Sequence, residues 1–266
     1  MNNKLKFAGI VAISALTACG PDVASNTVSV SPASGPFVGD RFTVSKTAGG
    51  DIYVDFGGGG VTYPVTNPTD IPGFVRFADQ AIGTDPNVVG YVVETADTVA
   101  LVVGTNTAAP TPTIGIAYSG AAFARSTAAE VPTTGSATYS GNYAGLISDG
   151  AGVASVMSGN VALSANFAGS TVSGAISNRE ETSRDGTRGS ISSPKSLDLA
   201  GIIGAAGNFS GTATGGEFAD GTTTSGGQFV GMFGGDGGNE AVGAVTIEHQ
   251  DGGTYTEVGV FFFFAD

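Results

Sequence analysis

Hydrophobic and polar residues alternate with a period of two over many short stretches of the chain, whereas no apolar stripe at helical spacing persists. Alternation with this period is typical of β-strands that bury one face. Gly, Thr, Ser and Val, which favour turns and strands, are abundant. The pattern therefore predicts an all-β protein.

The alternation is most regular in the second half of the chain, where it predicts eight strands with short connections. They are Gly135–Ile147, Gly159–Phe167, Val172–Asn178, Leu197–Ile203, Asn208–Thr214, Gly227–Gly234, Ala241–His249 and Tyr255–Phe264. Asp251, Gly252 and Gly253 form a strong hairpin signal between the last two. Consecutive antiparallel strands of this number can close on themselves, which removes both sheet edges. We predict an eight-stranded antiparallel up-and-down barrel over residues 131–266.

Aromatic residues and glycines alternate on one face of three of these strands. The positions are Tyr139, Gly141, Tyr143 and Gly145, then Phe209 and Gly211, then Phe229, Gly231 and Phe233. A small barrel needs glycine where its strands coil tightly, and an aromatic ring beside such a glycine covers the bare backbone. This regularity supports a closed barrel.

The preceding region, residues 28–130, predicts a small antiparallel sheet domain. Its expected strands are Arg41–Ser45, Asp51–Asp55, Val61–Val65, Val75–Ala78, Val88–Glu94, Thr98–Val103 and Ile114–Ala117. Ala96 and Asp97 lie at the turn of an expected hairpin, and prolines punctuate the loops and edges. The Ser/Thr/Ala/Pro stretch near Glu130–Thr134 separates this domain from the barrel.

The first residues have the pattern of a secretory signal. Met1–Lys6 is short and basic, and the apolar run Phe7–Leu16 is too short to span a bilayer. The sequence Leu-Thr-Ala-Cys-Gly at residues 16–20 resembles the lipobox of bacterial lipoproteins. The resemblance implies a signal peptide over residues 1–18, a diacylglycerol on Cys19 and a tether over 19–27. An ordinary signal peptide followed by an unrelated cysteine is the alternative.

Lipidation of Cys19 implies more than one acyl chain, which anchors a protein stably to a membrane. In Gram-negative bacteria an Asp after the lipidated cysteine favours the inner membrane, so Gly20 indicates the outer membrane. The protein then faces either the cell surface or the periplasm, and we expect the surface.

Charge and composition exclude several function classes. Ten basic and 23 acidic residues give a formal charge of −13, which disfavours binding to nucleic acid or to anionic lipid. One cysteine and one histidine rule out a disulfide framework and leave too few ligands of those types for a zinc site. We expect no cofactor and no metal.

Catalytic constellations are lacking in the sequence. His249 is the only histidine, and its place beside a predicted hairpin turn favours an exposed, structural residue. An axial haem ligand is the alternative for this residue. No Gly-x-Ser-x-Gly elbow occurs, and Gly57–Gly60 lacks the following Lys and helix of a phosphate loop. We therefore predict that the protein is not an enzyme.

Asn178–Ser196 is the least apolar stretch and contains four basic residues, Arg179, Arg184, Arg188 and Lys195. We interpret it as a solvated loop between the third and fourth barrel strands. A contact site for an acidic partner is the alternative.

The barrel sequence resembles that of transferrin-binding-protein-B-like bacterial surface lipoproteins over residues 131–264. The motifs are Gly-Ser-Ala-Thr-Tyr-Ser-Gly from Gly135, Phe-Ser-Gly-Thr-Ala from Phe209, and Phe-Val-Gly-Met-Phe-Gly from Phe229 followed by Asn-Glu-Ala-Val-Gly from Asn239. Two segments depart from the family pattern. Gly234-Gly235-Asp236 stands where the family has Gly-Pro in the turn, and Gly243-Ala244 replaces its paired glycines.

The resemblance implies a barrel beside a smaller sheet domain called the handle, both held at the outer membrane by the lipid on Cys19. It implies a non-catalytic surface for a protein or an iron- or haem-related partner, but it transfers no ligand residue. The alternative is a structural envelope lipoprotein or an integral outer-membrane barrel, for which the run Phe261–Phe264 is suggestive because it places aromatic residues on both faces of a strand.

Overall fold

The computed structural model describes residues 26–28, 43–46, 50–55, 61–66, 71–78, 88–105, 119–125, 131–148, 152–184, 194–217, 223–250 and 254–266. Within these ranges the regular structure is β-strand, apart from two short 3-10 turns, η1 (Ala205–Gly207) and η2 (Asp236–Gly238). No helix in this part of the chain is long and apolar enough to cross a membrane. The predicted signal peptide and Cys19 lie outside the described residues.

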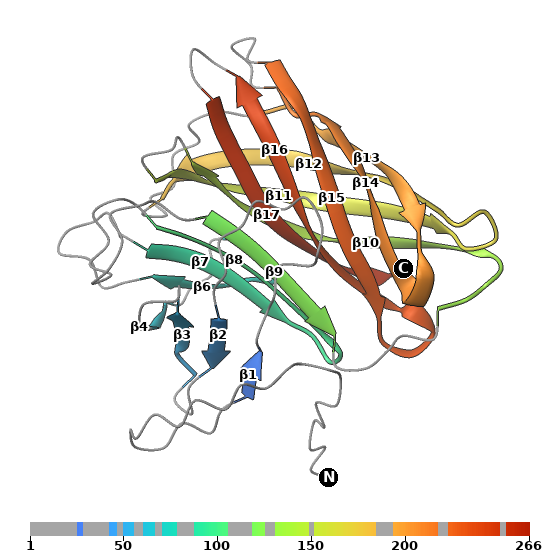
Figure 1. Cartoon of the computed structure of the whole chain (residues 1–266), viewed down its shortest axis with the longest axis horizontal. Helices are drawn as coiled ribbons and strands as arrows, with labels where there is room; N and C mark the ends of the chain where they lie inside the picture. The colour runs from blue at the N-terminus through green and yellow to red at the C-terminus, as the bar shows by residue number, and fades with distance from the viewer. Residues whose placement is uncertain are drawn as a thin grey trace.

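Eight consecutive antiparallel strands form a closed barrel, as the alternation predicts (Figure 1). They are β10 (Ser136–Ser148), β11 (Val153–Asn166), β12 (Thr171–Ser183), β13 (Leu197–Ile203), β14 (Asn208–Gly215), β15 (Thr223–Gly234), β16 (Glu240–Gln250) and β17 (Thr254–Ala265). The barrel closes because β10 pairs with both β11 and β17. Two expected boundaries are clearly wrong. β11 begins at Val153 rather than at Gly159, and β12 continues through Asn178–Ser183, which the sequence pattern placed in a loop.

The two ends of the barrel differ in their connections. At the short-turn end, residues 167–170, 204–207 and 235–239 join successive strands. At the loop end, the connections are residues 149–152, 184–196, 216–222 and 251–253. Each of these four contains an Asp-Gly pair in its sequence, a residue pair that favours tight turns.

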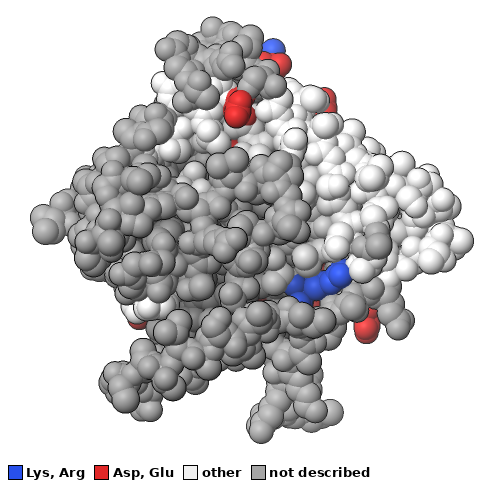
Figure 2. Space-filling model, viewed as in Figure 1, with Lys and Arg blue, Asp and Glu red and all other residues white. Residues whose placement is uncertain are grey.

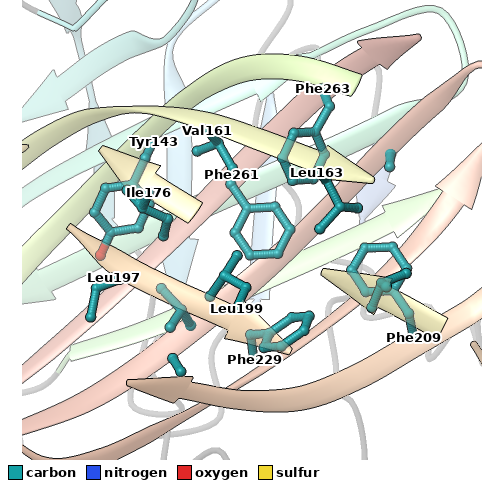
Figure 3. Close-up of a cluster of buried hydrophobic side chains, with 14 of the residues drawn as sticks. Tyr143, Val161, Leu163, Ile176, Leu197, Leu199, Phe209, Phe229, Phe261 and Phe263 are labelled. Atoms are coloured by element: carbon teal, nitrogen blue, oxygen red, sulfur yellow. The ribbon is translucent and has the colours of Figure 1, made fainter. Parts of the chain in front are cut away.

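Apolar side chains fill the barrel interior (Figure 3). Phe209, Phe233 and Tyr139 lie together, with ring centroids 4.9 Å apart between Phe209 and Phe233 and 5.5 Å apart between Phe233 and Tyr139. Phe261 and Phe263 extend this group along β17, with centroids 4.9 Å apart. The strands therefore enclose a packed core of rings and aliphatic side chains.

Paired glycines let these rings lie against the backbone. Gly145 on β10 is opposite Gly259 on β17, and the Tyr143 ring covers both, so an added Cβ would lie 2.4 or 2.2 Å from its hydroxyl oxygen. Gly231 and Gly243 form a second cross-strand pair beneath the rings of Phe209 and Phe261. The prediction that aromatic rings cover barrel glycines is confirmed.

The region before the barrel forms two antiparallel sheets, where the sequence predicted one. A four-stranded sheet has the order β1 (Asn26–Val28), β2 (Thr43–Lys46), β3 (Ile52–Asp55), β4 (Val61–Tyr63). A five-stranded sheet has the order β5 (Val65–Thr66), β6 (Val75–Ala78), β7 (Val88–Glu94), β8 (Thr98–Thr105), β9 (Ser119–Arg125). The predicted strand Val61–Val65 is split between the two sheets at Pro64, whose missing N–H cannot join a ladder.

Four further segments of this region can be compared with the sequence prediction. Asn26–Val28 is a strand paired with β2, although the sequence placed residues 19–27 in a tether. Ser119–Arg125 is a strand that the alternation did not predict. The predicted strand Ile114–Ala117 lies outside the described residues, and the turn at Ala96 and Asp97 between β7 and β8 is confirmed.

The five-stranded sheet lies between the four-stranded sheet and the barrel, and β7 and β8 are buried on both faces. Tyr91 and Val102 pack against outward-facing residues of β10, β16 and β17, while Leu101 and Val103 pack toward Ile52 and Val54. Burial on both faces explains the uninterrupted apolar runs in these two strands.

The same packing explains the run Phe261–Phe264. Phe261 and Phe263 point into the barrel, and Phe262 packs edge-on against Phe74, just before β6 of the five-stranded sheet, with centroids 5.2 Å apart. Only Phe264 is exposed, at 46%. The run therefore marks a strand that is buried on both faces rather than a girdle at a membrane interface.

Polar contacts also join the sheet to the short-turn end. Arg125 on β9 donates to the carbonyl oxygens of Phe233, at 2.8 Å, and Ala206, at 2.7 Å. Thr95, in the β7–β8 turn, donates its hydroxyl to the buried Glu240 carboxylate at 2.5 Å. These contacts fix the sheet against the end of the barrel that has short turns.

Candidate functional site at the loop end of the barrel

A β-bulge in β12 directs the side chain of Arg179 into the barrel. Asn160 pairs with Ser177 and Ser158 with Glu180, so the single residue Gly159 on β11 faces two residues on β12, Asn178 and Arg179. Asn178 has φ 50°, a left-handed conformation that Asn tolerates better than most residues.

The extra residue changes which side chains of β12 point inward. Ile176 and Arg179 are both buried although they are three residues apart, a spacing that an unbroken strand places on opposite faces. Bulges commonly re-aim a side chain in this way. Arg179 is 3% exposed as a result, which corrects the prediction that it belongs to a solvated loop.

Inside the barrel Arg179 belongs to an ionic cluster with Tyr143, His249 and Glu257. Arg179 Nη2 pairs with Glu257 Oε2, and His249 Nε2 lies 2.8 Å from the same oxygen. The Tyr143 hydroxyl donates to Glu257 Oε1 at 2.7 Å. The four side chains come from β10, β12, β16 and β17, and all are buried.

Two protonation states follow from this geometry. Burial by itself raises the pKa of Glu257, but the charge of Arg179 and the hydrogen bonds from His249 and Tyr143 outweigh it and lower that pKa to about 2. Burial, together with the charge of Glu257, raises the pKa of Tyr143 well above its usual value. At neutral pH Glu257 is therefore an anion and Tyr143 a neutral donor.

Arg179 also spans the seam between β12 and β13. In the part of the chain that the structure describes, their pairing stops at Ile176 and Leu197, and β12 runs on beside β11. Arg179 Nη1 donates across this seam to the carbonyl oxygens of Lys195, at 3.0 Å, and Gly216, at 3.2 Å. One guanidinium thus joins β12 to the bases of the β12–β13 and β14–β15 connections.

Charged side chains surround this end of the barrel. Glu180, Glu248 and Lys195 are exposed, and Arg184 and Glu217 are half-buried. Lys195 Nζ lies 3.8 Å from Glu217 Oε2, and Arg184 donates to the carbonyl oxygen of Val153 at 3.0 Å. Lys195 is thus exposed as the sequence predicted, Arg184 is half-buried, and Arg188 lies outside the described residues.

The barrel wall away from the sheets is polar and almost uncharged. We call the outward-facing side of β11–β14 the wall, and its exposed side chains include Asn160, Ser164, Ser173, Asp198 and Thr212. Figure 2, which colours only Lys, Arg, Asp and Glu, shows few charged side chains on the described surface in its view. An integral outer-membrane barrel has an apolar band outside and polar residues inside. In this barrel the interior is apolar apart from the ionic cluster, and the apolar outward-facing residues of β10, β16 and β17 are covered by the five-stranded sheet. The wall exposes mostly polar or small side chains, with Ile202 the exception, which argues against the integral alternative.

His249 is fully buried, which corrects the prediction of an exposed residue. The alternation in β16 gives the signal, because Val245 and Ile247 point inward and His249 continues their series. Glu257 was missed, although it precedes the inward-facing Phe261 and Phe263 on β17 at the same spacing. The contact with Glu257 occupies His249 Nε2, contrary to the haem-ligand alternative.

The described residues contain no group of three or more His, Cys, Asp or Glu side chains arranged to hold a metal ion. The ionic cluster consists of a buried ion pair, Arg179 with Glu257, and two further hydrogen-bond partners of the carboxylate, Tyr143 and His249. Arg179 connects the cluster to the barrel rim through the two carbonyl groups that it binds.

No protein-family model and no curated protein sequence matches the chain. Similar solved structures include a double mutant of transferrin binding protein B from Haemophilus parasuis Hp5, with 14% identity, a TM-score of 0.45, and coverage of 77% of this chain and 39% of that one. The isotype 1 protein from serogroup B Neisseria meningitidis has 13% identity, a TM-score of 0.42, and coverage of 85% and 49%.

A single mutant of the Haemophilus parasuis protein has 12% identity, a TM-score of 0.37, and coverage of 84% of this chain and 51% of that chain. The chain therefore spans about half the length, or less, of the structures it resembles. All three structures are transferrin binding proteins B, the name carried by the family that the barrel motifs resemble.

Proposed function

We propose that this chain is a lipid-anchored outer-membrane lipoprotein that presents a non-catalytic binding surface to a protein or an iron- or haem-related partner. The observation that carries the proposal is the packed barrel interior, where rings and aliphatic side chains fill the space between the strands. A barrel filled in this way acts as a rigid scaffold, and binding falls to its outer surface and connections.

The predicted anchor supports an arrangement in which the loop end faces away from the membrane. Cys19 precedes the first described strand, which begins at Asn26, by seven residues (26 − 19 = 7), a length that spans at most about 25 Å. Figure 1 shows β1 on the lower side of the molecule, whereas β16 ends and β17 begins on the upper side. The loop end and β1 therefore lie on different sides of the molecule, which supports a loop end that faces away from the predicted anchor.

The ionic cluster supports a role without catalysis. It contains a His, a Glu and a Tyr, residue types that catalyse proton transfer in many enzymes. All three are fully buried or nearly so, and a carboxylate with a pKa of about 2 is a poor general base at neutral pH. The cluster is therefore suited to holding structure in place.

Protease shaving of intact cells, followed by immunodetection, tests surface display. We expect digestion of this protein while a periplasmic control protein stays intact. Protection of both proteins would contradict surface display and favour the alternative of an envelope lipoprotein that faces the periplasm. A Cys19→Ala variant is the matched control for the anchor, and we expect it to leave the membrane fraction.

Binding is tested with the purified mature protein on a sensor surface, with iron-loaded transferrin and haem as separate probes. Saturable binding of either probe would support the proposal and identify the partner class. Surface display without binding of either probe would contradict the iron-related part of the proposal.

A further inference from the structure

We propose that Arg179 is a positioning residue, which holds the bases of two loop-end connections in place from inside the barrel. The positioning itself stands on the contacts of Arg179 alone. The statement that these connections meet a partner rests on the proposed function.

The backbone pairing shows why such a residue is needed. The β13–β14 ladder continues past its strands through two bonds, Lys195 N–H to the Glu217 carbonyl at 2.8 Å and Gly216 N–H to the Ser196 carbonyl at 2.9 Å. On the β12 side, regular pairing with β13 has already ended at Ile176. The bases of the two connections therefore have the Arg179 side chain, rather than strand pairing, as their link to β12.

Arginine suits this task better than any other side chain. Its planar fork binds Glu257 through Nη2 and the carbonyl oxygens of Lys195 and Gly216 through Nη1. A lysine ammonium is a single point on a flexible chain, so it can pair with Glu257 but cannot reproduce the fork. Arg179→Lys therefore separates the charge pair from the contacts with the two carbonyl groups.

Glu257 fixes the direction of the guanidinium. Tyr143 and His249 hold the carboxylate from two other strands, so its position depends on β10 and β16 as well as β17. The bulge at Asn178 then determines that Arg179, rather than Glu180, faces this carboxylate. The positioning of the connections is thus built from the barrel core outward.

Site-resolved amide hydrogen exchange on the full mature chain tests the proposal without any partner. In Arg179→Lys we expect the amides of Lys195 and Gly216 to exchange at least about tenfold faster than in the wild type. The amide of Ile203, at the other end of β13 and bonded to the Ser170 carbonyl at 2.9 Å, is the internal control and should keep its rate.

The same variant distinguishes positioning from general stabilisation. Equal acceleration at Lys195, Gly216 and Ile203 would overturn the proposal, because a purely structural role weakens the whole barrel. Unchanged exchange at all three amides would overturn it as well. If Arg179→Lys fails to fold, the double variant Arg179→Met with Glu257→Gln, which removes both charges, replaces it. We expect the same faster exchange at the amides of Lys195 and Gly216.

Phe209→Leu is the matched control for damage to the core at the other end. We expect it to accelerate exchange at Ile203 more than at Lys195 and Gly216, the opposite of the Arg179→Lys pattern. The reverse ranking would contradict the proposal. Because exchange needs neither a membrane nor a partner, the positioning role stands if shaving shows that the protein faces the periplasm.

Discussion

The two halves of the barrel interior are held by different forces. Toward the short-turn end the core consists of rings such as Phe209 and Phe233, which contribute area and packing in any arrangement that fills the volume. Toward the loop end Arg179, Glu257 and His249 contribute directed bonds that exist in one geometry. The comparison teaches that the aromatic half provides stability, whereas the charged half determines local arrangement.

Tyr143 lies where the two halves meet. Its ring covers the glycine pair Gly145 and Gly259 as the phenylalanines cover theirs, and its hydroxyl donates to Glu257. One side chain thus belongs to the packing of the first half and to the hydrogen bonding of the second. The Tyr143 ring therefore helps to shield the charged half from solvent.

The largest effect is expected in the aromatic half. Phe233 contacts the rings of Tyr139, Phe167 and Phe209. Phe233→Ala should lower the free energy of unfolding by about 3–5 kcal/mol, because it leaves a cavity among rings that cannot collapse. Denaturant unfolding measures the loss, which should be the same at pH 5 and pH 8. A loss below about 1 kcal/mol would contradict a filled interior.

In the charged half, Glu257→Leu should lower the free energy of unfolding by about 3 kcal/mol at neutral pH. It leaves Arg179 without its counter-ion and removes the acceptor of Tyr143, and breaking a buried pair costs about 3–5 kcal/mol. Asp198→Asn on the exposed wall is the matched control and should change stability by less than about 0.5 kcal/mol. Equal small losses in both variants would show that the pair adds nothing.

Acid should weaken the charged half selectively. The folded-state pKa of Glu257 is about 2, below its ordinary value of 4.5, so the stabilisation is complete above about 4.5 and disappears as the pH falls toward 2. We therefore expect the stability difference between wild type and Glu257→Gln to shrink over that range. The difference in the free energy of unfolding between wild type and Phe233→Ala should stay constant over the same pH range. A Glu257→Gln difference that is constant with pH would contradict an ionised Glu257.

The bulge should show the smallest of these effects. Asn178→Val should lower the free energy of unfolding by about 1–2 kcal/mol, because a β-branched residue is strained at φ 50°. Asn178→Gly is the control, since glycine adopts this conformation readily, and it should stay within about 0.5 kcal/mol of wild type. Thermal unfolding of both variants measures the difference. A Val variant as stable as the Gly variant would argue against the left-handed backbone.

Much of the fold follows from the alternation of residues in the sequence. The barrel strands, their order and the glycines beneath aromatic rings are all predicted, because one face of each strand packs against a core. The split of Val61–Val65 at Pro64 and the strand at Asn26–Val28 were missed. Strands of two to four residues show too little alternation to be recognised, so pairing with the neighbouring strand decides their structure.

The site was harder to predict, and each residue shows why. His249 and Glu257 continue inward-facing series on β16 and β17, so their burial follows once the strand lengths are known. Arg179 continues no inward-facing series, because the bulge at Asn178 reverses the inward and outward alternation of β12. The bulge itself is marked by a single feature, the left-handed backbone of Asn178. A polar stretch with four basic residues gave no indication that one of them lies inside the barrel.

A double-mutant cycle on Arg179→Met and Glu257→Gln tests most directly whether the charged half acts as one unit. We predict that each single variant is strongly destabilised, and that the double variant, which buries no unpaired charge, lies within about 1 kcal/mol of wild type. The resulting coupling would be about 2 kcal/mol or more. Additive losses, with the double variant the least stable of the three, would contradict the account.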